Sequence, residues 1–229
     1  MAHPFRQYPL FLDLRGRRVL VVGGGSVASR KVQSLLEAGA RVTVTAPEIS
    51  DGIAAMAIPS AGLDLMRREW RAEDLEGATL AIAASNDREV NLRVASECRS
   101  RGILVNVVDD PSACDFFVPA VVERGVLRLA ISTGGASPAV ARLLRETLEE
   151  LIDSSWELLA DLLGLLREPA RQQLDAPRRR ELFASIASTG FLALLKNDRE
   201  AARQALLDLG ERFGISIPDE ALSRIDDRG

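Results

Sequence analysis

The feature that most constrains the fold of this chain is a glycine-rich segment between an apolar run and an amphipathic helix. Residues 18–22 are almost entirely apolar, which is typical of a strand buried on both faces of a parallel sheet. The segment Gly23-x-Gly25-x-x-Ala28 follows at once, and further apolar residues then recur at helical spacing until Gly39. The first glycine permits a tight turn, the second lets the backbone approach a pyrophosphate, and Ala28 allows close helix–strand packing.

This context predicts dinucleotide binding, with the phosphates at the start of the helix, where free amide groups and partial positive charge meet. The alternative is a glycine turn that serves packing alone. The predicted contacts are Gly23, Gly24, Gly25, Ser26 and Val27.

Apolar strands and amphipathic helices alternate as far as residue 108. Further strands are predicted at 41–45, 63–66, 79–84 and 103–108, with a short helix over 48–57 and a longer one after residue 87. This order is typical of an α/β fold with a Rossmann-like, doubly wound parallel sheet.

The pattern changes after residue 108. Residues 116–122 and 126–132 flank a turn that contains Gly125, which predicts a β-hairpin. A helix is predicted to start at Ser137-Pro138, and the rest reads as helical to about residue 224, interrupted at Pro169, Pro177 and Pro218. We therefore expect an NAD-binding domain over 1–112, a dimerisation region over 113–150 and a helical C-terminal domain over 151–229.

The acidic residue that usually binds the adenosine ribose is not at the end of the second predicted strand. That strand ends in Thr45, and Pro47 and Glu48 follow a little beyond the usual place. Either Glu48 or the backbone around Pro47 holds the ribose, unless Glu48 only begins a helix. No arginine follows the strand to take a 2′-phosphate, so NAD is favoured over NADP.

Composition excludes several classes of protein. A net charge of −4 and 4% aromatic residues argue against a nucleic-acid binder. Two cysteines, Cys98 and Cys114, cannot build a disulfide framework or a four-thiolate zinc site. The single histidine, His3, argues against a Ser-His-Asp triad and against a site with several histidine ligands, and no metal site is predicted. No apolar run reaches the ~18 residues of a membrane span, so we expect a cytoplasmic protein with reduced thiols.

Several strings in the first two thirds of the chain resemble the siroheme synthase family, in the order found there. The dehydrogenase module of that family is precorrin-2 dehydrogenase, which is often bifunctional with sirohydrochlorin ferrochelatase. The strings cover about residues 8 to 152 and are Val19 to Lys31 (VLVVGGGSVASRK), Ala83 to Asp87 (AASND) with Asn91, Asn106 to Asp109 (NVVD), Phe116 to Ala120 (FFVPA), and Ser132 to Pro138 (STGGASP) with Ala141-Arg142.

The resemblance implies NAD-dependent oxidation of precorrin-2 to sirohydrochlorin in a homodimer whose central segments intertwine. It also implies that the aspartate at the Asp109 position matters for catalysis. Insertion of Fe²⁺ or Co²⁺ into the product stays open at this point.

Asp109 follows an apolar strand, so its carboxylate is expected at the carboxyl end of the sheet, where ligands bind. It could take the proton that the substrate loses as hydride passes to nicotinamide. The alternative is a turn-forming aspartate before Pro111, a role that we assign to the neighbouring Asp110.

Ser85, Asn86 and Asn106 lie at the same predicted edge as Asp109. Ser85 and Asn86 could hold a ribose or the nicotinamide, or else Asn86 or Asp87 caps the next helix. Asn106 is a further candidate for binding the cofactor.

A second small-residue loop precedes the helix at Pro138. Thr133, Gly134 and Ser137 could admit a bulky ring or bind a carboxylate at the helix start, and Arg142 could pair with a substrate carboxylate. The alternatives are a flexible connection and an ion pair within the chain.

A second functional class is a nucleotide-sensing regulatory domain of an ion transporter. Such domains share the glycine loop and an Asn-Asp segment after a later strand. They usually carry a firm ribose-binding acid and lack the NVVD and STGGASP strings, so the enzyme is favoured.

Overall fold

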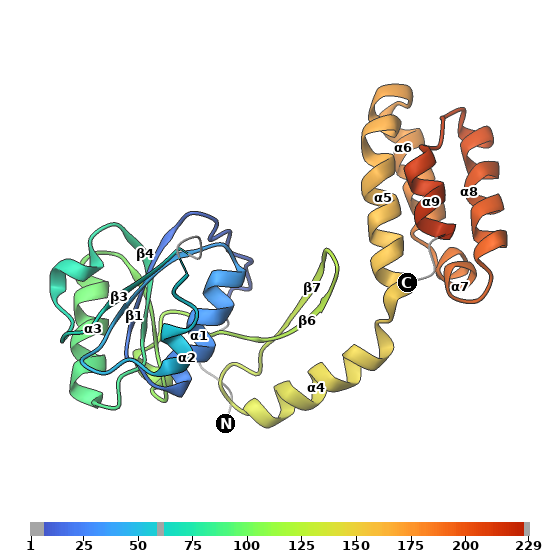
Figure 1. Cartoon of the computed structure of the whole chain (residues 1–229). Coiled ribbons are helices and arrows are strands. Elements are labelled where there is room, and N and C mark those ends of the chain that lie inside the picture. The colour runs from blue at the N-terminus through green and yellow to red at the C-terminus, as the bar shows by residue number, and fades with distance from the viewer. Residues whose placement is uncertain (1–6, 59–61, 227–229) are drawn as a thin grey trace. The chain divides into compact units, whose positions relative to one another are not determined.

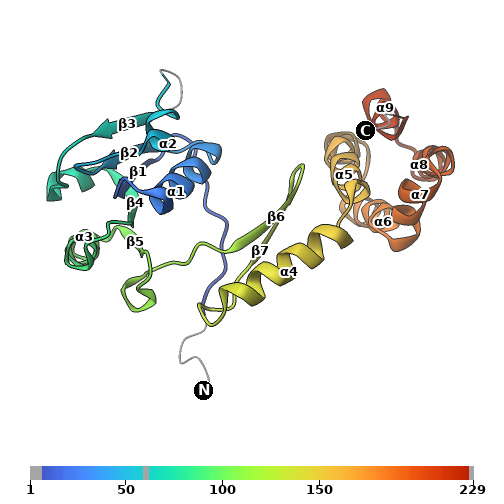
Figure 2. The ribbon, with the colours of Figure 1, turned by 60° about the horizontal axis from the view of Figure 1, so that its bottom comes forward.

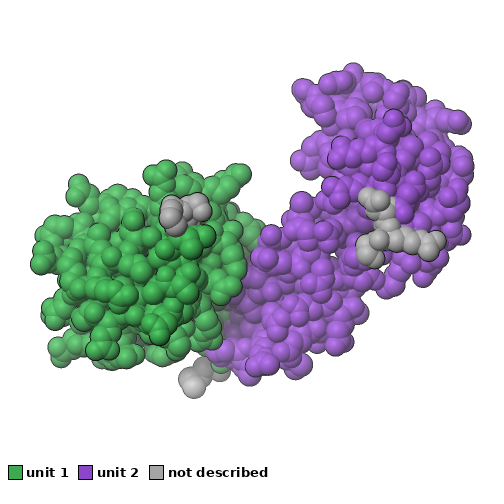
Figure 3. All heavy atoms as spheres, in the orientation of Figure 1, with its two compact units in different colours: residues 1–118, 134–136 green, residues 119–133, 137–229 purple. Residues whose placement is uncertain are grey.

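A computed structural model describes residues 7–58 and 62–226, and the chain divides into two compact units. The first unit comprises residues 1–118 with 134–136, and the second comprises 119–133 with 137–229 (Figure 3). His3 lies outside the described residues. Across the described ranges, no helix has the length and apolar character that crossing a bilayer requires. The expected division into three domains stays a prediction.

The first unit is built on a parallel sheet with the strand order β3-β2-β1-β4-β5 (Figure 1). The order reverses beside β1, so the carboxyl ends of β1 and β4 form the switch point at which such sheets bind ligands. The strands are β1 (Arg18–Val22), β2 (Arg41–Thr45), β3 (Leu63–Met66), β4 (Ala78–Ala83) and β5 (Leu104–Val107).

Alternate residues of the strands pack on opposite faces of this sheet. Val19 and Val21 belong to one buried cluster with helix α1 (Ser26–Glu37), whereas Leu20 and Val22 belong to another with helix α3 (Arg88–Ser100). Figure 2 shows these two helices on opposite sides of the sheet. The predicted α/β fold with a parallel sheet is therefore confirmed.

The expected helix over 48–57 is wrong in extent, because α2 covers only Asp51–Ala54. The chain before it is held to the glycine loop, since the Ser50 amide donates to the carbonyl oxygen of Gly24 at 2.9 Å. Residues 48–50 therefore serve the loop rather than a helix.

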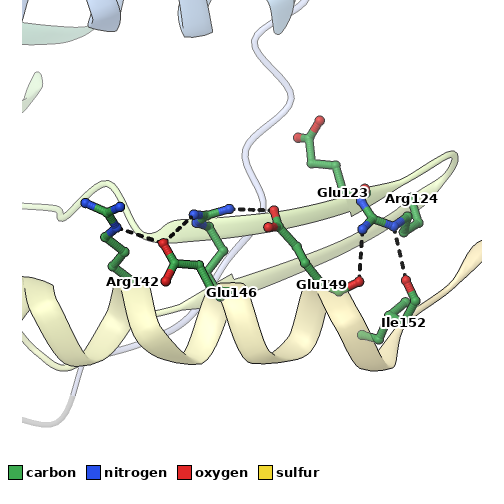
Figure 4. A network of polar contacts seen from close by, with 7 residues as sticks. Glu123, Arg124, Arg142, Glu146, Glu149 and Ile152 are labelled. Carbon is green, nitrogen blue, oxygen red and sulfur yellow. Dashed lines mark hydrogen bonds and ion pairs between the residues drawn. The ribbon is translucent and has the colours of Figure 1, made fainter.

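The second unit begins with the predicted hairpin, formed by β6 (Ala120–Arg124) and β7 (Leu127–Ile131). Gly125 adopts a φ of 52° in the turn, which favours glycine. Helix α4 (Pro138–Leu151) follows, capped by the Ser137 hydroxyl, which accepts from the amide of Val140 at 3.3 Å. Arg124 of the hairpin donates to carbonyl oxygens at the other end of α4, those of Glu149 at 3.0 Å and Ile152 at 3.1 Å (Figure 4).

The rest of the second unit is a helical bundle around its own apolar core. Most of its helices start at an Asp or Ser cap, as local chemistry predicts. The expected break at Pro169 is wrong, because this proline lies inside α5, where buried Leu166 and Ala170 hold the helix against the core. The helices are α5 (Ser154–Gln173), α6 (Ala176–Ile186), α7 (Thr189–Asn197), α8 (Arg199–Phe213) and α9 (Asp219–Asp226).

Candidate functional site

The glycine loop between β1 and α1 is shaped by close approach of neighbouring backbone. A Cβ atom on Gly23 would lie 2.3 Å from the carbonyl oxygen of Ala84, and one on Gly24 would lie 1.9 Å from that of Glu48. A Cβ on Gly25 would meet nothing within 4 Å. The first two glycines therefore hold the loop against its neighbours, whereas the third faces open space. Sequence reasoning missed the packing role of Gly24, because it occupies a variable position of the motif.

The start of α1 is open to an anion. Gly25 caps the helix without a side chain, and the first helical hydrogen bond runs from the Ser29 amide to the Gly25 carbonyl oxygen at 2.9 Å. The amides of Ser26 and Val27 consequently have no partner within the helix, and no acidic side chain lies in its first turn. The loop and the helix start together fit the pyrophosphate of a dinucleotide.

The end of β2 carries an unpaired hydroxyl where the motif usually carries an acid. Thr45 is fully buried, and its Oγ1 has no hydrogen-bond partner among the described residues. Its carbonyl oxygen accepts from the Gly23 amide at 3.0 Å, which places it beside the loop. Pro47 and Glu48 are exposed just beyond. Ribose binding by Glu48 or by the local backbone stays a prediction, and Thr45 joins these groups as a further candidate.

The segment after β4 is fixed by an asparagine that sequence reasoning noted only as part of a motif. Asn91 of α3 is 5% exposed, and it accepts from the Ser85 amide at 3.0 Å and donates to the Ser85 carbonyl oxygen at 2.9 Å. The helix cap is Asp87, which accepts from the amides of Glu89 and Val90. Asn86 is thereby left exposed, and its side chain is not used by the cap.

Asp109 is the one described non-glycine residue with a positive φ, which is 61°. Aspartate tolerates this conformation better than most side chains, and such backbone outliers cluster at functional sites. Asp109 is exposed just past β5, while the neighbouring Val108 amide donates to the Ala83 carbonyl oxygen at 2.9 Å. Its carboxylate makes no hydrogen bond or ion pair with the described residues.

Asp110, in contrast, is engaged by its neighbours. Its carboxylate accepts from the Ser112 hydroxyl at 2.6 Å and pairs with Arg88 at 3.1 Å. The hydrogen bond from Ser112 and, after it, the contact with Arg88 lower the pKa of Asp110. Of the two adjacent aspartates, only Asp109 keeps a carboxylate available to a ligand.

The segment that follows Asp110 is bound back to β5. The Asn106 side chain is 8% exposed and donates to the carbonyl oxygen of Phe116 at 2.9 Å, so its amide group serves the fold. A role for Asn106 in cofactor binding stays a prediction. Because the NH2 group of its side chain is engaged, Asn106 would have to contact the cofactor through its Oδ1 or its backbone.

Both cysteines are free, and burial raises the pKa of each thiol, that of Cys98 to about 11. The Cys114 sulfur lies 3.2 Å from both the amide nitrogen and the carbonyl oxygen of Val107. These contacts explain why Cys114 is structural rather than reactive.

The predicted substrate residues of the second unit take part in local hydrogen bonds. Thr133 Oγ1 accepts from the Ser137 amide and donates to the Ser137 carbonyl oxygen, both at 3.1 Å. Arg142 is exposed and pairs with Glu146 at 2.8 Å, one turn along α4 (Figure 4). An exposed pair of this kind is weak, so a substrate carboxylate could replace it. Gly134 has a φ of 64° and is grouped with the first unit.

No group of three or more His, Cys, Asp or Glu residues in the described part of the chain could hold a metal ion. The groups that remain available to a ligand around the switch point are the backbone amides at the start of α1, the buried hydroxyl of Thr45 and the unpaired carboxylate of Asp109. This arrangement can bind a dinucleotide and accept a proton beside it.

Comparison with known proteins finds two family models that match successive stretches of the chain. A family described as putative NAD(P)-binding matches residues 10–120, and the central family of sirohaem biosynthesis proteins matches residues 124–151. The chain is 39% identical over 201 residues to a siroheme synthase of Mannheimia succiniciproducens, covering 87% of the chain and 42% of that relative. It is 44% identical over 206 residues to one of Methylococcus capsulatus, covering 89% and 43%. The chain thus spans less than half the length of these relatives.

A solved structure described as the precorrin-2 dehydrogenase SirC superposes with a TM-score of 0.75 at 31% identity, covering 90% of this chain and 100% of that one. Nothing in these comparisons supports a regulatory domain of a transporter. The chain therefore belongs to the family formed by precorrin-2 dehydrogenases and the corresponding part of siroheme synthases.

Proposed function

We propose that this chain is an NAD-dependent precorrin-2 dehydrogenase, which oxidises precorrin-2 to sirohydrochlorin. The observation that carries the proposal is the unpaired carboxylate of Asp109. The backbone of this residue has a positive φ, and it follows β5 at the same sheet edge as the glycine loop. The likeness to a precorrin-2 dehydrogenase over nearly the whole chain supports the choice of substrate.

Different residues contact the cofactor and accept the proton from the substrate. Amides of Ser26 and Val27 hold the pyrophosphate of NAD, Pro47 and Glu48 lie on the ribose side, and Ser85 and Asn86 lie at the end of β4. Bound NAD supplies a nicotinamide that accepts hydride. The substrate loses a hydride to the cofactor and a proton to a base, and Asp109 is the base whose position and freedom fit this step.

An anaerobic assay with precorrin-2 and NAD tests the proposal directly. Sirohydrochlorin absorbance should appear together with NADH, and omission of NAD should abolish both signals. Folded protein that produces neither signal would refute the proposal. NADP in place of NAD should be the poorer cofactor, because no arginine follows β2 to receive a 2′-phosphate.

Insertion of Fe²⁺ or Co²⁺ into sirohydrochlorin is a further activity that the family resemblance suggests. If the chain performs it, we propose that Asp109 accepts the protons displaced from the pyrrole nitrogens. Adding either ion to the completed dehydrogenase reaction, with and without protein, measures this activity separately from the oxidation.

We also propose that the chain acts as a homodimer. Apolar residues of α4 line one helix face yet stay exposed, with Val140 at 47%, Leu143 at 62%, Leu144 at 45% and Leu151 at 64%. A contiguous exposed stripe of this kind is typical of an interface, and a second copy offers the same stripe in a symmetric arrangement. Sedimentation that shows only monomer at micromolar concentration would contradict this proposal.

The expected compartment is the cytoplasm. Cys98 and Cys114 are both free thiols that serve the packing of the first unit. A reducing compartment keeps such thiols intact.

A further inference from the structure

The loop that carries Asp109 (residues 108–113) is closed at its base by the chain that follows it. The loop begins directly after β5, which lies at one end of the strand order, and Asp115 then lies back beside Val105 of that strand. The Asp115 amide donates to the carbonyl oxygen of Val105 at 2.8 Å, and the Val105 amide donates to Asp115 Oδ2 at 3.1 Å. This residue pair therefore joins the chain before the loop to the chain after it.

Arg99 of α3 holds the same closure from the helix. Its Nη2 donates to the carbonyl oxygen of Ala113 at 2.8 Å, and its Nε donates to Asp115 Oδ1 at 3.4 Å. The two carboxylate oxygens of Asp115 thus have separate partners, one on the strand and one on the helix. Cys98, next to Arg99, is fully buried in the same apolar cluster as Val105, so the helix is a packed support for the loop.

Asp109 depends on its loop for its conformation. Its φ of 61° is disfavoured for a residue that has a Cβ atom, and such a backbone persists only where surrounding contacts hold it. The entry to the loop is fixed by the Val108 amide, which donates to the carbonyl oxygen of Ala83 at 2.9 Å. Because the Asp109 carboxylate has no partner within the described ranges, its direction follows from the backbone, and Asp115 fixes the exit of that backbone.

We propose that Asp115 is a positioning residue for the oxidation of precorrin-2. Together with Arg99 it closes the loop and so keeps the Asp109 carboxylate directed at the substrate, without touching the substrate itself. The inference rests on the proposed function, which assigns the role of base to Asp109. A base must lie within hydrogen-bond reach of the proton that it takes, and a displacement of about 1 Å can cost about a hundredfold in rate. A loosened loop should therefore slow the chemical step more than it weakens binding.

The test uses substitutions that remove these contacts one at a time. Asp115→Ala removes both carboxylate contacts, whereas Asp115→Asn keeps the shape and an oxygen that can accept from Val105. Arg99→Gln removes the support from the helix. The matched control is Arg101→Gln, because Arg101 lies at the same end of α3 and pairs with Glu97 of that helix at 3.3 Å. The measurements are kcat and KM for precorrin-2, the Kd of NAD, thermal unfolding, and hydrogen exchange of residues 108–113 by mass spectrometry.

Asp115→Ala should lower kcat about tenfold and speed hydrogen exchange in the loop. KM and the Kd of NAD should change less than about twofold, because the glycine loop is intact. Arg99→Gln should lower kcat about threefold, since the hydrogen bonds between Asp115 and Val105 remain. Asp115→Asn should recover most of the activity, and Arg101→Gln should match the wild type.

A double-mutant cycle separates positioning from general support of the fold. If Asp115 acts on the reaction through Asp109, then Asp115→Ala should have no further effect on kcat in the Asp109→Asn background. A residue that only stabilises the domain would lower the residual rate of Asp109→Asn as well. Equal losses in the two backgrounds would therefore refute the inference.

Two other results would also overturn it. Folded Asp115→Ala with the kcat of the wild type would refute it, and so would a loss confined to NAD affinity, which would assign Asp115 to the cofactor site. If Asp115→Ala does not fold, unchanged kcat and unchanged loop exchange in folded Arg99→Gln would refute it instead. In all of these cases the wild type is active. Wild-type protein that does not oxidise precorrin-2 would refute the proposed function, and this inference with it.

Discussion

The parallel sheet of the first unit and the hairpin with α4 in the second unit bury their apolar residues very differently. In β1, Val19, Leu20 and Val21 are fully buried by helices on both faces. In the hairpin, Val122 is fully buried, whereas Leu143 and Leu151 of the adjoining α4 are more than 60% exposed. The sheet buries its apolar residues under helices of its own unit, whereas α4 leaves an apolar stripe exposed.

The same contrast governs the polar groups of the two regions. Beside the switch point, Asn91 holds both the backbone amide and the carbonyl group of Ser85, at 3.0 and 2.9 Å, just past the end of β4. On α4, Arg142, Arg145, Glu146 and Glu149 form a chain of ion pairs that is partly open to solvent (Figure 4). The first region is therefore suited to a catalytic site, which needs fixed geometry. The ion pairs of the second region can be replaced by other charged partners at little cost.

The largest expected effect is that of Gly24→Ala, which disrupts the close packing of the glycine loop in the first unit. The added Cβ would lie 1.9 Å from the Glu48 carbonyl oxygen, so the loop and the segment before α2 must separate. We expect a loss of about 3 kcal/mol in the free energy of unfolding of this unit and no measurable NAD binding. Denaturant unfolding and NAD titration measure the two effects.

Gly25→Ala is the matched control for Gly24→Ala. Its Cβ would meet no protein atom within 4 Å, so the stability should stay within about 0.5 kcal/mol of wild type while NAD binding weakens. Equal destabilisation by both variants would show that the loop is held by something other than this close approach.

Next in size is the effect of Asp109→Asn on catalysis. Asparagine also tolerates a positive φ, so the fold and the Kd of NAD should be preserved. Formation of sirohydrochlorin should fall about a hundredfold or more, the usual worth of a positioned base. Asp110→Asn should stay active, because Asp110 is occupied by Ser112 and Arg88. A sensitive Asp110 and an insensitive Asp109 would reverse the assignment.

Leu143→Glu tests whether the exposed stripe of α4 is covered by a second copy. In a symmetric dimer the charge enters the interface from both subunits, so the dimer Kd should rise about thirtyfold or more. Sedimentation measures this shift, and Arg171→Gln on the bundle surface should leave it unchanged. A monomeric wild type would contradict the dimer itself. A dimer whose Kd is unchanged by Leu143→Glu would show that another surface forms the interface.

The smallest expected effect concerns Asp74, a buried carboxylate of the first unit. A hydrogen bond from Arg68, at 2.6 Å in the ion pair, is the main effect that lowers the pKa of Asp74. Because the folded pKa is depressed, its stabilisation is present above the unfolded pKa of about 4 and is lost as the pH falls through the folded pKa. Asp74→Asn should cost about 1 kcal/mol at pH 7 and less in acid.

Glu168 of the second unit is the comparison for Asp74. Arg171 and, after it, Gln172 lower the pKa of Glu168 to about 2, but both Glu168 and Arg171 are more than half exposed. Solvent screens such a pair, so Glu168→Gln should leave the pH dependence of unfolding almost unchanged. An equal effect of the two substitutions would remove the distinction between buried and exposed pairs.

Local sequence patterns were sufficient for the strands, the long helices and the glycine loop, because each depends on spacing within a few residues. Strands β1 and β2 and the hairpin turn at Gly125 lie where those patterns predict them. Pro169 and the short α2 do not, because buried contacts of α5 and the Ser50–Gly24 hydrogen bond override local preference.

At the site, the sequence by itself determined the residue types and their order: the glycines before a helix, two aspartates after a strand, and a small-residue loop before Pro138. Only the tertiary structure decided which aspartate is free, that Asp87 rather than Asn86 caps α3, and that the amide of Asn106 serves the fold. It also showed the unpaired Thr45 hydroxyl. The physical reason is that hydrogen bonding and burial of a side chain depend on partners far apart in sequence, such as Arg88 for Asp110 and Phe116 for Asn106, which no local pattern encodes.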